Sequence, residues 1–200
     1  PGTTSYYGSE SASSSGSIHI FESEEWNYIK SFNPVSDLYY RFGLSVSIAN
    51  NTLTVGATSR KAYIYEKNND GEWVSIEPIM NPSEDMANNF GGSAIQIDSN
   101  RIIVGAYGEN NTQGSIYLHE KNSNGNWLLV DTFDYPFTVD ESELEEKNYN
   151  NFFGYSVAIS SQYAVVGTLF ENHFKPGRPW GTTRHKGSVF IYERQTNNTW

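Results

Sequence analysis

The feature that most constrains this chain is an internal repeat of four ordered phrases. Each unit starts with Phe-Gly-x-Ser and an apolar run, and a Val-Gly phrase follows. A third phrase alternates apolar and aromatic residues and ends in glutamate, and a tryptophan stands seven residues later. Repetition of several landmarks in one order indicates a repeat architecture. The copies start at Phe42, Phe90 and Phe153, continue at 55–57, 104–106 and 166–168, then at 62–66, 114–120 and 187–193, and close at Trp73, Trp127 and Trp200.

The segments inside each unit have the composition of β-strands. They are short, rich in Val, Ile, Tyr and Thr, and bounded by turn-forming residues. We expect tight hairpins, with residues that tolerate positive φ, between the first and second segments at 50–51, 98–100 and 160–162. Similar turns follow the third segments at 68–71 and 122–126. No stretch has a 3.6-residue period, so we expect almost no helix, and each unit is predicted to be a four-stranded antiparallel meander.

Repeated four-stranded meanders are typical of a β-propeller, because a single blade cannot bury its own faces. We therefore predict an all-β chain, a β-propeller built of four-stranded antiparallel blades. A ring needs about four to eight blades, so we expect part of a larger propeller, or one completed by another copy. The predicted units are a partial blade at 1–35, blades at 36–83 and 84–135, and an incomplete blade at 136–200. Glycines at 43, 91 and 154, and at 56, 105 and 167, are expected where blades approach closely.

The Phe-Gly and Val-Gly-Ala phrases resemble the FG-GAP repeat, over about Tyr6 to Trp200. FG-GAP blades build the N-terminal propeller of integrin α-subunits and of bacterial and protist relatives, so the resemblance implies an extracellular or cell-surface protein. Integrin blades carry a D-x-D-x-D-G calcium loop between the first two strands, whereas the connections here are two or three residues long. Calcium needs six to eight oxygen ligands, so we expect no metal site and no cofactor. We interpret Asp37 and Asp85, five residues before an FG phenylalanine, as turn residues.

Composition narrows the classes of partner. The chain has no cysteine, which excludes a disulfide scaffold and a thiolate zinc site. A net charge of −10 argues against general nucleic-acid binding, and no apolar run approaches the length of a membrane span. Sequons at Asn50, Asn110 and Asn197 are the candidate glycosylation sites.

An enzymatic role finds no support in the predicted innermost strands. Residues 42–49, 90–97 and 153–160 include no Asp, Glu, His, Lys or Arg, whereas glycoside hydrolysis needs paired carboxylates. We therefore expect no catalytic activity, and the remaining alternative of this kind is a non-catalytic part of a larger secreted enzyme. His19 and His119 fall in third strands of different units, and His173 and His185 in one loop. We interpret all four as polar positions on outer strands and not as metal ligands.

Two insertions interrupt the repeat and are the candidate binding loops. Residues 134–151 include an acidic run at 140–146, and residues 169–186 are basic and aromatic. In a meander both connections emerge on one face, so they either neutralise each other or bind a ligand. We favour recognition, because Trp and Arg are enriched in interface hot spots. The candidate binding residues are Phe174, Lys175, Arg178, Trp180, Arg184 and His185.

The sequence thus predicts a non-enzymatic interaction, adhesion or assembly module outside the cell or on its surface. Its expected partners are a protein, further copies or segments of a larger propeller, or glycans. The alternative is a lectin-like propeller that binds sugar between blades, where an aromatic ring would stack on the pyranose.

Overall fold

The computed structural model describes residues 16–22, 26–33, 41–58, 60–83, 89–92, 95–98, 100–137, 151–170, 186–197 and 199–200. These residues form four antiparallel sheets, none of which closes on itself, and one helical turn, α1 (Glu109–Thr112). The all-β prediction is therefore confirmed. Sheet 1 holds β1 (Ile18–Glu22) and β2 (Asn27–Phe32); sheet 2 holds β3 (Ser45–Ala49), β4 (Thr52–Gly56), β5 (Lys61–Lys67), β6 (Trp73–Ser75) and β7 (Ile79–Met80); sheet 3 holds β8 (Ile95–Asp98), β9 (Arg101–Ala106), β10 (Ser115–Lys121) and β11 (Trp127–Asp134); sheet 4 holds β12 (Ser156–Ile159), β13 (Tyr163–Gly167) and β14 (Val189–Glu193).

Sheets 2 and 3 follow the predicted meander order, and sheet 4 follows it over its three strands. The register repeats as well, since Ser45 pairs with Gly56 in sheet 2 and Ser156 pairs with Gly167 in sheet 4. Positive φ was expected in all three connections between the first two strands, but among their described residues only Asn50 has it. The 160–162 turn instead uses the hydroxyl of its first serine, which accepts hydrogen bonds from the backbone amides two and three residues later.

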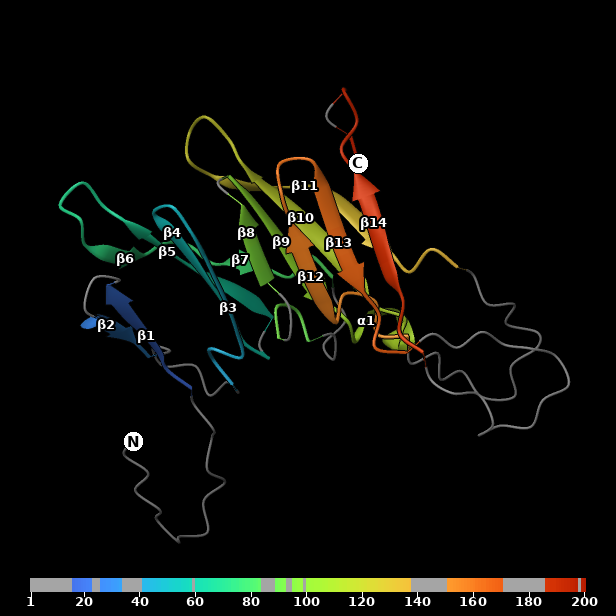
Figure 1. Cartoon of the computed structure of the whole chain (residues 1–200), viewed down its shortest axis with the longest axis horizontal. Coiled ribbons are helices and arrows are strands. Elements are labelled where there is room, and N and C mark those ends of the chain that lie inside the picture. Colours follow the sequence, from blue (N-terminus) through green and yellow to red (C-terminus); the bar gives the residue numbers. More distant parts are fainter. Residues whose placement is uncertain are drawn as a thin grey trace, which may run out of the picture.

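The sheets stand side by side in chain order, as Figure 1 shows, and a hydrophobic core fills each space between neighbours. Each core combines two rows. The earlier sheet contributes aliphatic side chains of its third strand, and the later sheet contributes aromatic ones. The second strand of the later sheet adds aliphatic side chains, such as Val55, Val104 and Val166. Ile18 and Ile20 meet Tyr65 and Trp73, Ile64 meets Tyr117, and Ile116 and Leu118 meet Phe190 and Tyr192.

The repeated glycines lie where neighbouring sheets touch through their backbones. A Cβ atom on Gly56, at the end of β4, would overlap the carbonyl oxygen of Gly91 in the next unit. A Cβ on Gly114 would likewise overlap the carbonyl of Phe153. The Ser45 hydroxyl donates to the Gly91 carbonyl at 2.9 Å and joins sheets 2 and 3 at the same point. Glycine at 43, 56 and 154 thus permits close stacking of the sheets, as the sequence predicts, whereas a Cβ on Gly167 would meet Ser156 of its own sheet.

Ion pairs repeat at the other end of the third strands. The glutamate near the end of β5, Glu66, contacts Lys121 of the next sheet at 2.6 Å, and Glu120 contacts Arg194 of the following sheet at 3.0 Å. Both cations directly follow the glutamate of their own unit. Each cation also lies over the tryptophan of its unit, at 5.6 Å for Lys121 and Trp127. One repeat position therefore links adjacent sheets by charge as well as by packing.

Candidate functional site

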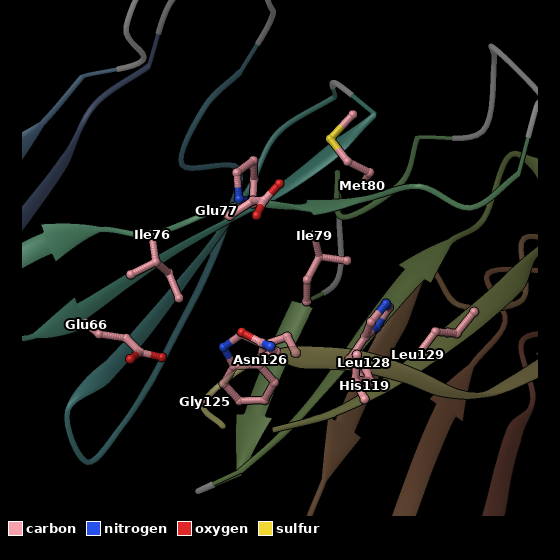
Figure 2. Close-up of a pocket in the computed structure, with 12 residues that line it drawn as sticks. Glu66, Ile76, Glu77, Ile79, Met80, His119, Gly125, Asn126, Leu128 and Leu129 are labelled. Carbon is pink, nitrogen blue, oxygen red and sulfur yellow. The ribbon is translucent and has the colours of Figure 1, made fainter. Parts of the chain in front are cut away.

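A groove of about 540 Å³ opens between sheets 2 and 3, within the usual volume range of ligand sites. It forms where the β5, β6 and β7 region faces the turn between β10 and β11 and the start of β11. Figure 2 shows Glu66, Ile76 and Glu77 grouped on one side and His119, Leu128 and Leu129 on the other, with Asn126 between them. The remaining lining residues are Pro78, Ile79, Met80, Gly125 and Trp127.

His119 is the buried polar residue of this groove. Its repeat equivalents are Tyr65 and Tyr192, one residue before the unit's glutamate, and these pack on the preceding sheet. Burial lowers the pKa of His119 to about 4, so the ring is neutral at physiological pH. Its Nδ1 atom has no hydrogen-bond partner. The interpretation of His119 as a polar position on an outer strand did not include this burial, which arises because the third strand packs on the sheet before it.

The other polar groups lie toward the rim of the groove. Glu66 is held by Lys121 at 2.6 Å, and Asn126 and Glu77 are exposed. The Trp127 ring packs against the core between sheets 2 and 3, and its Nε1 atom lacks a hydrogen-bond partner. Apolar walls with a few separate polar groups can bind a small ligand by stacking and hydrogen bonding. The described lining residues offer no neighbouring nucleophile and base.

The predicted binding loop cannot be compared with the structure. Phe174, Lys175, Arg178, Trp180, Arg184 and His185 lie outside the described residues, and so do the acidic run at 140–146, Asp37 and Asp85. The three sequon asparagines are described and exposed. Asn50 lies in the β3–β4 hairpin, whereas the Asn110 amide donates to Ser115 at 3.1 Å and to Asp134 at 3.2 Å.

A second candidate surface is the outer face of sheet 4, which we call the tail face and define as Tyr163, Val165, Val189 and Ile191. These residues are neighbours on β13 and β14, since Val165 pairs with Ile191. Val189 and Ile191 are 67% and 69% exposed. The equivalent residues, counted back from each unit's glutamate, are Ala62 and Ile64 in sheet 2 and Ile116 and Leu118 in sheet 3, and all four are 0% exposed.

The sequence contains a signal for each of these two surfaces. The lectin alternative predicted a site between blades without naming its residues, and the tail face was not predicted. For the groove, the signal is a histidine at a position where two other units have tyrosine. For the tail face, it is an apolar pair at 189 and 191, the positions where the other two units have apolar residues at 62 and 64 and at 116 and 118. Composition and loop length do not show either signal. Those two properties instead pointed to the two insertions as the candidate binding loops.

Within the described part of the chain, no three His, Cys, Asp or Glu side chains gather as metal ligands would, and no helix has the length and apolar character to cross a membrane. No protein-family model matches the chain, and no curated protein matches it either.

Proposed function

We propose that this chain is a non-enzymatic interaction and assembly module of the FG-GAP propeller type, located outside the cell or on its surface. The proposal is supported by sheets that stack in chain order, by the repeated glycine contacts between them, and by innermost strands without ionisable residues. The location rests on the FG-GAP resemblance. In this proposal, binding uses the candidate loops at 134–151 and 169–186 and the sheet surfaces that stacking leaves uncovered.

The tail face carries this proposal. Ile64 and Leu118 are completely buried by the following sheet, whereas Ile191 at the same repeat position is 69% exposed beside Val189. Fully burying an aliphatic side chain of this size contributes about 1.5–3 kcal/mol. Adjacent exposed aliphatic residues on a flat sheet face therefore favour coverage by another protein surface.

A photo-crosslinking side chain at position 191 tests the proposal whatever the identity of the partner. The chain is expressed in its source cells with the crosslinker at Ile191, or at Val130 as a matched control. Val130 is 48% exposed on β11, outside the tail face. We expect a discrete protein adduct at position 191 and none at position 130. Failure to capture any protein at position 191 would overturn the proposal.

The groove supports a second candidate function, carbohydrate binding. Its walls combine the Trp127 indole with the Asn126 amide and the Glu77 carboxylate, which are the group types that stack on and hydrogen-bond a pyranose. A glycan array, with bound signal competed by the free sugar, tests this function. Asn126→Ala should reduce binding, whereas Asn124→Ala in the same turn should not, because Asn124 does not line the groove. Absence of any competed signal excludes the lectin function.

A further inference from the structure

The aromatic row of sheet 1 has no sheet packed on it among the described residues. We define the head face as His19, Phe21, Trp26 and Tyr28. The Phe21 and Tyr28 rings lie 6.0 Å apart, and His19 and Tyr28 lie 6.4 Å apart, on the side of sheet 1 opposite the residues that pack against sheet 2. At the corresponding places in sheet 2, Tyr65 and Trp73 are buried against sheet 1.

The exposure of Trp26 shows that the head face is uncovered where the equivalent part of sheet 2 is buried. Trp26 is 76% exposed beside the last strand of its unit, whereas Trp73, which begins the last strand of sheet 2's meander, is 4% exposed. Phe21 is 51% exposed, and its equivalents Tyr65 and His119 are both 4% exposed. The head face is therefore an aromatic row without its aliphatic partner.

The head and tail faces are the two halves of one interface. Each of the three internal interfaces includes an aliphatic row of the earlier sheet and an aromatic row of the later sheet, together with aliphatic residues of the later sheet's second strand. The tail face is an uncovered aliphatic row, and the head face is an uncovered aromatic row. Figure 1 places sheets 1 and 4 at opposite ends of the stacked row. A contact that joins them therefore uses the tail face of one molecule and the head face of another.

We propose that the tail face binds the head face of a second copy of this chain, an inference that rests on the proposed assembly function and names its partner. Val189 and Ile191 of one copy pack on Phe21 and Trp26 of the next. The contact repeats the aliphatic and aromatic rows of an interface that each chain already makes three times, which favours a second copy over an unrelated surface. Because its two sides differ, the association is heterologous and produces a closed ring or a filament.

The charge pattern distinguishes the proposed contact between copies from the interfaces within the chain. Within the chain, Glu66 contacts Lys121 and Glu120 contacts Arg194, and each cation directly follows the glutamate of its own unit. In the contact between copies, the glutamate is Glu193 of the tail unit. The residue that follows Glu22 in the head unit is Ser23, so the sequence supplies no cation at this repeat position. The association is therefore expected to be held mainly by apolar packing and to depend little on salt.

Sedimentation velocity with complementary variants tests the proposal. Ile191→Arg disables the tail face and Trp26→Arg disables the head face, and each should weaken self-association by at least about 30-fold. Mixed together, these variants retain one intact head face and one intact tail face, so they should form a one-to-one dimer that grows no further. Val130→Arg, at an exposed residue of β11, should associate like the wild type. Near-ultraviolet circular dichroism checks that each variant is folded.

A gain-of-function variant tests the register. Ser23→Lys supplies the cation that the internal interfaces have, so it should tighten association by about two- to fivefold at low salt, and Ser23→Glu should not. A monomeric wild type, or a tail-to-tail dimer that Trp26→Arg leaves intact, would overturn the inference. If the crosslinker at position 191 then captures a different protein, the assembly function stands without the second copy. If it captures nothing, both proposals fail.

Discussion

Replacing Gly154 by alanine should destabilise the protein more than replacing Gly71 by alanine, although both glycines have nearly the same backbone conformation. Gly154 has φ +84° and Gly71 has φ +79°. A non-glycine residue in this left-handed region costs about 1–2 kcal/mol. That cost is common to both substitutions, so the difference between them reports the surroundings of the new methyl group.

The surroundings differ sharply. A Cβ on Gly154 would lie 2.7 Å from the Ser115 carbonyl oxygen and 2.9 Å from Cγ2 of Ile116, in the preceding sheet. A Cβ on Gly71 would have no atom within 4 Å. Overpacking of this kind costs about 1–3 kcal/mol. We therefore expect a loss of about 1–2 kcal/mol for Gly71→Ala and about 2–5 kcal/mol for Gly154→Ala.

Guanidinium unfolding followed by tryptophan fluorescence measures both losses, with the slope compared among variants to confirm that midpoints report stability. Gly91→Ala is a third variant for this comparison, because Gly91 has φ +69° and the atom nearest to an added Cβ would be 3.6 Å away. It should resemble Gly71→Ala. Equal losses at 71 and 154 would refute the idea that close sheet stacking, and not backbone conformation alone, requires glycine at 154.

Three further predictions concern the protonation of His119, the removal of calcium and the loop at 169–186. Because burial holds the pKa of His119 at about 4, below its usual 6.5, the unfolded chain takes up a proton first as pH falls. The free energy of unfolding should therefore drop between about pH 6.5 and 4 by up to about 3 kcal/mol. His119→Tyr, which introduces the residue of the two equivalent positions, should remove that part of the pH dependence. The same pH dependence of stability in the wild type and in this variant would contradict the prediction. Excess EDTA should leave the thermal midpoint unchanged, since the hairpins between first and second strands are too short to enclose calcium; a calcium-specific drop would show otherwise. Trp180→Ala combined with Arg178→Ala should leave the thermal midpoint nearly unchanged and weaken association with a partner by at least about 2 kcal/mol. Lost stability with intact association would mean that the 169–186 loop stabilises the fold and does not bind the partner.

Much of the fold could be predicted because the repeat places the same local chemistry at the same position in each unit. The alternation of apolar and aromatic residues before Glu66, Glu120 and Glu193 sets the two faces of each third strand, and β5, β10 and β14 form where it predicts. The glycine phrases predicted close approach, and Gly56 lies against Gly91. These features depend on neighbours in the chain or on the same contact in every unit.

Burial of single residues could not be predicted in the same way. His119 was interpreted only as a polar position on an outer strand, but its position belongs to an aromatic row that packs on the preceding sheet, as Tyr65 and Tyr192 do. The groove follows from the same arrangement, since residues of sheets 2 and 3 line it together beside His119 and Trp127. Its shape depends on the angle between sheets, which no local pattern in the sequence specifies.

The uncovered rows distinguish this array from one whose ends are caps. In stacked repeat proteins the terminal units usually have a polar outer face, because they border water and not another unit. Here the outer positions of the end units keep the chemistry of the interior. Val189 and Ile191 stand where Ala62 and Ile64 are buried, and Trp26 is exposed where sheet 2 buries Trp73. Exposed residues that cap an array have no physical reason to stay aliphatic at one end and aromatic at the other. Retention of this complementary pair of rows on sheets 1 and 4 favours binding through the head and tail faces, so substitutions at both faces, more than in the groove, should separate folding from function.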